Sequence, residues 1–395
     1  MLFYVSVTLI DVMPAENPFV YGEIVSASAF ADRALELDRL ERDLSAGQKI
    51  FLISPRRYGK SSLIRYALRR LARQGVLTVE VTVSSSSSYA AFLEAYARAL
   101  LTAETPVGRL RQWATEMFRA VRPEVRVETA PSGSARVSLA FPAVQTQRDV
   151  ARLAAEVFTL PDRIADARRR RVAVALDEFQ AITGFNGGTV EHALRAAVQD
   201  QRRVGYVFAG SEPSLMERML GPRRPFYKAG PVVRLEKIPA DEFAAFLETR
   251  FTSTGIKPEA GLGLAIVDLA GNVPYDVQRL AHESWDDLRV AGRKTAGLED
   301  LHATLTRLLR EQDTMFEEAW QRLTLAQRGV LRALVLEHGR ELLSADVRTR
   351  YRLAGASSVQ SALAALVRDD VITKQATTYA VVYSLFREWV ARKTF

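Results

Sequence analysis

The chain of 395 residues contains no cysteine. Disulfides, and zinc or iron–sulfur sites with cysteine ligands, are therefore excluded, and a reducing compartment is the simplest environment. No apolar run is long enough to span a bilayer. The apolar opening MLFYVSVTLIDV has no basic residue before it and no small-residue cleavage site, which argues against a signal peptide. We expect a cytoplasmic protein with no membrane partner.

Lysine is scarce: 8 lysines stand beside 46 arginines. The formal net charge is nevertheless +8, which favours polyanionic partners such as nucleic acid or the phosphates of a nucleotide. Apolar residues make up 48% of the chain, enough for the cores of two or three domains. A lysine inside a motif is conspicuous against this background.

The first 240 residues alternate between short apolar runs and helix-like segments. Strands are predicted at 49–54, 76–83, 172–177, 204–211 and 231–238. Strands separated by helices predict a parallel sheet covered on both faces. Alternating residues around Pro-Ser-Gly, at about 123–142, predict an inserted β-hairpin. From about 240 onward the pattern is almost wholly helical, and 323–395 ends in a short strand pair.

The stretch SPRRYGKSSL has the pattern of a phosphate-binding loop, G-x-x-x-x-G-K-[ST], with Ser54 in place of the first glycine. A small residue can make that turn if its φ is negative. Gly59 lets the backbone approach a phosphate, Lys60 reaches the β- and γ-phosphates, and Ser61 holds Mg²⁺. The residues predicted to bind nucleotide are Ser54, Pro55, Arg56, Arg57, Tyr58, Gly59, Lys60, Ser61 and Ser62.

A second motif lies in VAVALDEFQ, residues 172–180. Five apolar residues predict a buried strand that ends in Asp177 and Glu178. Downstream of a phosphate loop, Asp177 is expected to hold Mg²⁺ through water and Glu178 to polarise the attacking water. The alternative is a strand end that merely meets solvent.

Three further residues are candidates for catalysis. Ser211, at the end of the fourth apolar run, either contacts the γ-phosphate region or caps the next helix. Arg223 and Arg224, in GPRRPFY, are candidates to supply transition-state charge in the same chain or to a neighbouring subunit. A solvated face is the alternative for both arginines.

Together these motifs resemble the archaeal-type P-loop ATPase family, a branch of the STAND and AAA+-related NTPases. NPFVYGEIV is similar to its N-terminal segment, whose apolar residues flank adenine. AGNVPYDVQRLA, residues 270–281, resembles its lid motif, which implies that Pro274 packs on the base. Residues 324–390 are similar to its C-terminal winged helix.

The resemblance implies an α/β fold in three parts. A P-loop ATPase domain with a parallel sheet and helices on both faces is expected at 1–239, with the hairpin insertion at about 123–142. A helical lid domain follows at 240–318, and a winged-helix domain at 319–395.

The winged-helix segment is a weak candidate for DNA binding. Residues 323–395 carry 11 basic and 6 acidic side chains, a net charge of +5 that permits contact with phosphate. However, the expected recognition helix, about 357–369, offers few side chains that read base edges: Ser357, Ser358, Gln360 and Ser361. It also ends beside two carboxylates, which repel phosphate.

The leading hypothesis is a slow, Mg²⁺-dependent ATPase that uses ATP as a conformational switch. A protein partner is expected, and self-association into a homo-oligomer is one way for an arginine to act on a neighbouring subunit. Two alternatives stay open: a DNA-binding ATPase akin to origin-recognition proteins, and a scaffold that holds ATP without hydrolysing it and signals to a partner.

Overall fold

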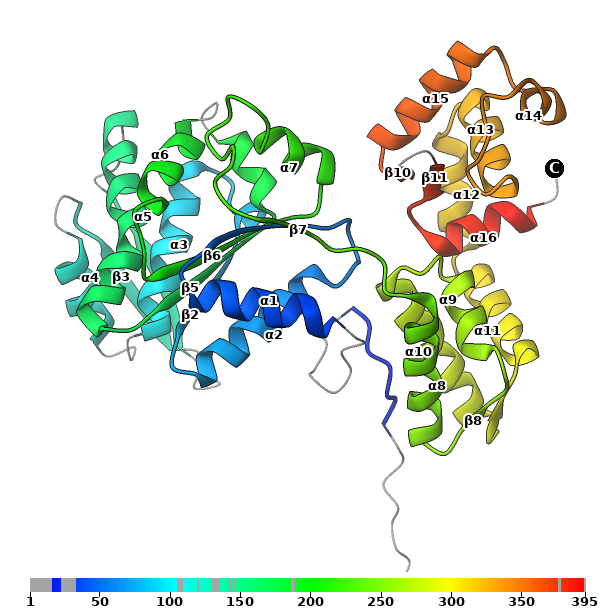
Figure 1. Cartoon of the computed structure of the whole chain (residues 1–395), viewed down its shortest axis with the longest axis horizontal. Helices are drawn as coiled ribbons and strands as arrows, with labels where there is room; N and C mark the ends of the chain where they lie inside the picture. Colours follow the sequence, from blue (N-terminus) through cyan, green and yellow to red (C-terminus); the bar gives the residue numbers. More distant parts are fainter. Residues whose placement is uncertain are drawn as a thin grey trace, which may run out of the picture. The chain divides into compact units, whose positions relative to one another are not determined.

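The computed structural model describes residues 16–22, 33–104, 109–118, 121–129, 135–142, 144, 146–185, 189–375 and 378–393. Packing divides the chain into two compact units, one of residues 32–237 and one of residues 238–395 together with 1–31 (Figure 1). The packing boundary lies two residues before the domain boundary expected at 239. The predicted hairpin turn and the opening apolar stretch lie outside the described residues.

The first unit is built on a five-stranded parallel sheet. β5 and β6 are buried along their whole length, because helices cover both faces. The predicted α/β fold with a parallel sheet is therefore confirmed, although the last strand is shorter than expected. The strand order is β2 (Leu77–Thr82), β5 (Val172–Asp177), β6 (Val204–Gly210), β1 (Lys49–Ile53), β7 (Val232–Arg234).

Two groups of helices sandwich this sheet (Figure 1). α1 (Ala34–Ser45) and α2 (Lys60–Arg73) pack together on one face. The other face is covered by α3 (Tyr89–Glu104), α5 (Gln147–Arg168) and α6 (Thr189–Val198). Short elements complete the unit: η2 (Val83–Ser85), α4 (Leu110–Met117), η4 (Phe179–Gly184) and α7 (Pro213–Met219).

The insertion predicted at about 123–142 is an antiparallel hairpin of β3 (Glu124–Thr129) and β4 (Ala135–Ala140). It packs with α4 against α3.

The second unit is helical and holds two small sheets, a parallel pair β8–β9 and an antiparallel pair β10–β11. Its elements are α8 (Ala240–Ser253), β8 (Lys257–Pro258), α9 (Leu262–Leu269), α10 (Pro274–Val290), β9 (Thr295–Ala296), α11 (Leu298–Glu311), α12 (Asp313–Arg322), α13 (Leu325–Leu336), α14 (Ala345–Arg350), α15 (Ala356–Arg368), β10 (Ile372–Gln375), β11 (Thr378–Val381) and α16 (Ser384–Arg392). Within the described ranges, every helix is too short or too polar to cross a bilayer.

Polar contacts join the last helix, α16, to α9 and α10. Asp276 accepts hydrogen bonds from the Ser384 hydroxyl (2.7 Å) and backbone N–H (3.3 Å) at the start of α16, which satisfies a donor that the helix leaves open. Arg279 donates to the Tyr383 hydroxyl at 2.7 Å. Arg387 of α16 donates to two carbonyl oxygens at the end of α9, at 2.9 and 3.0 Å. The winged helix therefore shares one core with the helices before it.

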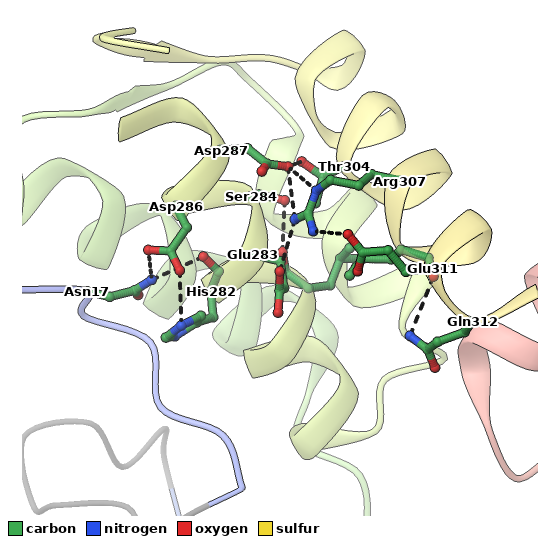
Figure 2. A network of polar contacts seen from close by, with 12 residues as sticks. Asn17, His282, Glu283, Ser284, Asp286, Asp287, Thr304, Arg307, Glu311 and Gln312 are labelled. Atoms are coloured by element: carbon green, nitrogen blue, oxygen red, sulfur yellow. Dashed lines mark hydrogen bonds and ion pairs between the residues drawn. The ribbon is translucent and has the colours of Figure 1, made fainter. Parts of the chain in front are cut away.

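The N-terminal segment 16–22 packs in the second unit, against α10 (Figure 2). The Phe19 ring is buried and lies 4.7 Å from that of Phe251, and the Asn17 amide donates to Asp286 at 2.8 Å. The sequence prediction assigned this segment to the ATPase domain. The segment packs instead in the second unit, because the apolar side chain of Phe19 is buried there against Phe251.

Polar contacts extend this docking along α10 to α11. The Tyr21 hydroxyl donates to Glu283 at 2.9 Å. Arg307 of α11 holds Glu283 (2.9 Å) and Asp287 (3.1 Å) at the same time, as Figure 2 shows. These bonds raise the pKa of Arg307 despite its partial burial and lower that of Glu283. The N-terminal segment is thus joined to a continuous ionic network.

Gly205 allows α1 to pack closely on β6. A Cβ at this position would lie 2.2 Å from the Leu44 carbonyl oxygen of α1. Gly205→Ala should lower the free energy of unfolding by about 1–3 kcal/mol, the usual cost of overpacking. Denaturant unfolding followed by circular dichroism measures the difference.

Gly184→Ala is the matched control for this prediction, because its Cβ would meet no atom within 4 Å. Equal unfolding midpoints for the two variants would contradict the close backbone contact between α1 and β6.

Candidate functional site

The loop between β1 and α2 has the backbone of a phosphate cradle. Gly59 precedes α2 with φ 83°, a left-handed conformation that favours glycine. Arg57 adopts φ 70°. Ser54 is not among the residues with positive φ, so a serine can stand at the position of the first glycine. Its side chain is buried, and its hydroxyl donates to the Pro55 carbonyl at 2.9 Å. No side chain caps the first turn of α2, so its N–H groups remain available to an anion.

The charged groups of both motifs meet at the carboxyl edge of the sheet. Lys60 and Asp177 are each only 5% exposed and form an ion pair. The Lys60 ammonium also lies 3.3 Å from Glu178 Oε1. Ser61 donates to Asp177 Oδ2 at 2.7 Å. The structure therefore brings together four of the residues that the sequence singled out, across 116 to 118 positions of chain.

Ser61 and Asp177 offer the oxygen donors that Mg²⁺ prefers. The described residues contain no group of three or more His, Asp or Glu side chains that could hold a metal ion by themselves. A hydroxyl beside a carboxylate fits the mode in which Mg²⁺ keeps several waters and takes its other ligands from a phosphate.

Glu178 has a strained backbone and a well-defined set of partners. Its φ is 52°, in the left-handed region that non-glycine residues seldom occupy. Oε2 accepts hydrogen bonds from the Ser211 hydroxyl (2.5 Å) and the Gln180 amide (2.6 Å). Burial raises the pKa of Glu178, but these two bonds and the nearby Lys60 charge outweigh it, so the pKa is lowered. The side chain is an ionised acceptor.

A cavity of about 460 Å³ opens beside Glu178. Its wall includes the polar side chains of Arg56, Ser84, Gln180, Ser211 and Glu212, together with the apolar Ala181 and Leu215. This volume accommodates a phosphoryl group together with water. The sequence analysis did not single out Gln180, although this residue is the last of the VAVALDEFQ motif. The pattern that could have indicated it is a polar residue three positions after the end of a buried strand.

The remaining loop residues have varied surroundings. Tyr58 is buried, Pro55 and Ser62 are half-buried, and Arg57 is exposed. Arg56 lies 3.7 Å from Glu212 with both side chains largely exposed, a pairing that contributes little to stability. These residues adjoin the ionic cluster, and their contacts with a nucleotide remain predictions.

Pro274 opens α10 in the second unit and is not part of the cluster at the sheet edge. Its neighbour Tyr275 meets the Tyr21 ring edge-on at 5.8 Å. The packing of Pro274 on a base remains a prediction.

Arg224 has a partner that the sequence did not reveal. Its guanidinium lies 2.9 Å from Glu191, a carboxylate that is only 1% exposed. The adjacent Arg223 is exposed, with φ 66°, and has no ion pair within the described part of the chain. Of the two arginines predicted to supply transition-state charge, Arg224 therefore neutralises a buried carboxylate of its own chain.

Comparisons with known proteins agree with this architecture. A family model described as a probable winged helix domain matches residues 314–392. A Walker-type ATPase of Pyrococcus abyssi is similar in structure, with a TM-score of 0.60, 15% identity, and coverage of 92% of this chain and 97% of that one. None of the curated proteins matches this sequence.

Two origin-recognition proteins of Aeropyrum pernix are also similar. The ORC2 protein, in ADPNP–ADP complexes, has a TM-score of 0.53, 14% identity, and 95% coverage of both chains. The ORC1 protein, in complex with DNA, has a TM-score of 0.50, 14% identity, and 92% coverage of both. The chain has the fold of Walker-type P-loop ATPases with a C-terminal winged helix, as the resemblance implied.

Arg224→Ala is expected to destabilise the protein by about 1–3 kcal/mol at pH 7, because a buried carboxylate loses its partner. Burial already raises the pKa of Glu191, and Arg224 opposes this. Without Arg224 the pKa rises further, so stability is lost as the pH increases through that pKa. The loss should vanish as the pH falls below the ordinary value of 4.5. Thermal unfolding across this pH range measures it.

Arg223→Ala is the matched control and should keep wild-type stability at every pH. Adding Glu191→Gln to Arg224→Ala should restore most of the loss, because the neutral amide needs no cation. A variant Arg224→Ala that loses turnover but not stability would instead assign this arginine to the reaction.

Proposed function

We propose that this chain binds ATP with Mg²⁺ at the carboxyl edge of its sheet and hydrolyses it slowly. The observation that carries the proposal is the meeting of Lys60 and Ser61 with Asp177 and Glu178. Phosphoryl transfer needs a cation that neutralises charge on the phosphates, a hydroxyl and a carboxylate that hold the metal ion, and a second carboxylate that activates water. These four groups lie together here.

In this proposal the protein groups divide the work. Lys60 binds the β- and γ-phosphates, and Ser61 and Asp177 hold the metal ion, which when bound neutralises charge on the phosphates. Glu178 accepts a proton from the attacking water, which its ionised state permits. Ser211 orients Glu178 through its 2.5 Å hydrogen bond.

We further propose that the nucleotide acts as a switch on the second unit. The chain crosses from one unit to the other twice. The first crossing follows residue 22 and precedes residue 33, and the second lies at residues 237–238. Because α16 and the N-terminal segment are both bonded to α10, a displacement of α10 moves the winged helix as well. A protein partner that binds the winged helix would sense this movement.

The second candidate function is DNA binding, favoured by the +5 charge of residues 323–395 and by the likeness to an origin-recognition protein solved with DNA. The predicted recognition helix is α15. Its basic residue Arg368 is paired with Asp369 at 2.9 Å, and Arg350 of α14 with Glu337 at 2.7 Å. These pairings leave less positive charge for DNA, so we place this function second.

Glu178→Gln is expected to lower kcat by about 100-fold or more, the usual contribution of a general base, while ATP binding persists. Phosphate release measures turnover, and chromatography of the retained nucleotide should find ATP instead of ADP. Glu212→Gln is the matched control, since it removes an exposed carboxylate from the same cavity.

Turnover unaffected by Glu178→Gln would contradict the role of this carboxylate. A wild-type protein that retains ATP stoichiometrically and releases no phosphate would instead be a non-hydrolysing scaffold.

Duplex DNA is expected to bind only at low salt and to change phosphate release by less than about twofold, because acidic partners offset the charge of two exposed arginines of the winged helix, Arg350 and Arg368. Fluorescence anisotropy with a labelled duplex at several salt concentrations measures this. Lys374→Glu tests the exposed wing. Tight binding at physiological salt that Lys374→Glu weakens would favour the origin-recognition-like function.

A further inference from the structure

The two oxygens of Glu178 have different surroundings. Oε2 accepts two hydrogen bonds from neutral donors of the same chain, Ser211 at 2.5 Å and Gln180 at 2.6 Å. Two bonds use both lone pairs of one carboxylate oxygen. Among the described residues, the Lys60 ammonium is the polar partner of Oε1, at 3.3 Å. A phosphate that attracts Lys60 would leave Oε1 as the oxygen able to accept a proton.

Gln180 is held firmly enough to select between these oxygens. It is 4% exposed and lies in η4, the turn that follows Glu178. The preceding Phe179 anchors this turn, with its ring 4.7 Å from that of Phe208. Gly210 makes room for the side chain, because a Cβ there would lie 2.8 Å from Gln180 Oε1 and 2.4 Å from Met216.

The amide of Gln180 serves as a donor in this arrangement. Its nitrogen lies 2.6 Å from Glu178 Oε2 and 3.4 Å from Ser211 Oγ. Its oxygen, although buried, has no hydrogen-bond partner among the described residues. The reverse orientation would bring the amide oxygen against an ionised carboxylate. A buried acceptor left unsatisfied is costly, and the donated bond to Glu178 offsets part of that cost.

We propose that Gln180 is a positioning residue of the ATPase reaction: with Ser211 it occupies Oε2 of Glu178 and so directs Oε1 toward the attacking water. This inference rests on the proposed function and assigns a role to a residue outside the phosphate loop and the acidic pair. Gln180 touches neither nucleotide nor water in this role and acts only through Glu178.

The test is Gln180→Met, which keeps side-chain length and removes the donor. We expect kcat to fall by about tenfold or more, with KM for ATP changed by less than about twofold. In the Glu178→Gln background the same substitution should change the residual rate by less than about twofold, because the group that Gln180 positions is already altered. If Gln180 had only a structural role, Gln180→Met would lower kcat by the same factor in the wild-type and the Glu178→Gln backgrounds.

Gln201→Met is the matched control. Gln201 is another buried glutamine, whose amide donates to the Phe158 carbonyl at 2.7 Å and accepts from Tyr206 at 2.7 Å, away from the ionic cluster. The Gln201→Met variant should be less stable than the wild type, but its kcat should not fall as that of Gln180→Met does. Thermal unfolding of each variant confirms that the assays compare folded proteins.

A crystal structure with Mg²⁺ and ATPγS gives a second readout that does not depend on turnover. Wild-type Glu178 should direct Oε1 to the terminal phosphate with Oε2 on Gln180 and Ser211, and in Gln180→Met the carboxylate should rotate. An unchanged carboxylate in the variant, or equal kcat values, would overturn the inference. Absent phosphate release from the wild type would overturn the proposed function, while the rotation would still show whether Gln180 fixes the orientation of the Glu178 carboxylate.

Discussion

The arrangement of the site depends on a lysine ammonium buried among carboxylates. A buried charge is tolerated only where partners replace the water that it has lost. Lys60 meets this requirement through Asp177 and Glu178, two acidic groups at the tip of a strand more than 100 residues away. One cation facing two anions leaves negative charge in excess. In the proposed function, a divalent metal ion at Asp177 would offset this excess, and the phosphates would attract Lys60.

The parallel sheet makes this meeting possible. All five strands end at the same edge, so the loops after β1, β5 and β6 converge there. β6 lies between β1 and β5, and Ser211, at its end, reaches the carboxylate of Glu178. The left-handed backbone of Glu178 turns its side chain back toward that hydroxyl. Strain of this kind at a strand end persists because the buried strands on both sides fix the turn.

The second unit has a different organisation, in which polar contacts join helices that the sequence separates into domains. Asp276 of α10 holds the start of α16, and the N-terminal segment packs on the same helix. The Arg307 network extends this connection to α11. The N-terminal segment, α11 and the start of α16 are therefore all joined to α10 by polar contacts.

The sequence by itself determined the order of strands and helices, the phosphate loop and the acidic pair. Those features are local, since the conformation of Gly59, the burial of β5 and the helix after Lys60 follow from short patterns. Tertiary structure alone decided which partners the side chains have. Gln180 donates to Glu178, and Arg224 pairs with Glu191. Residues 16–22 pack with α10 in the second unit and not with the sheet. Periodicity reports that a residue is buried, but its partner depends on how distant elements pack.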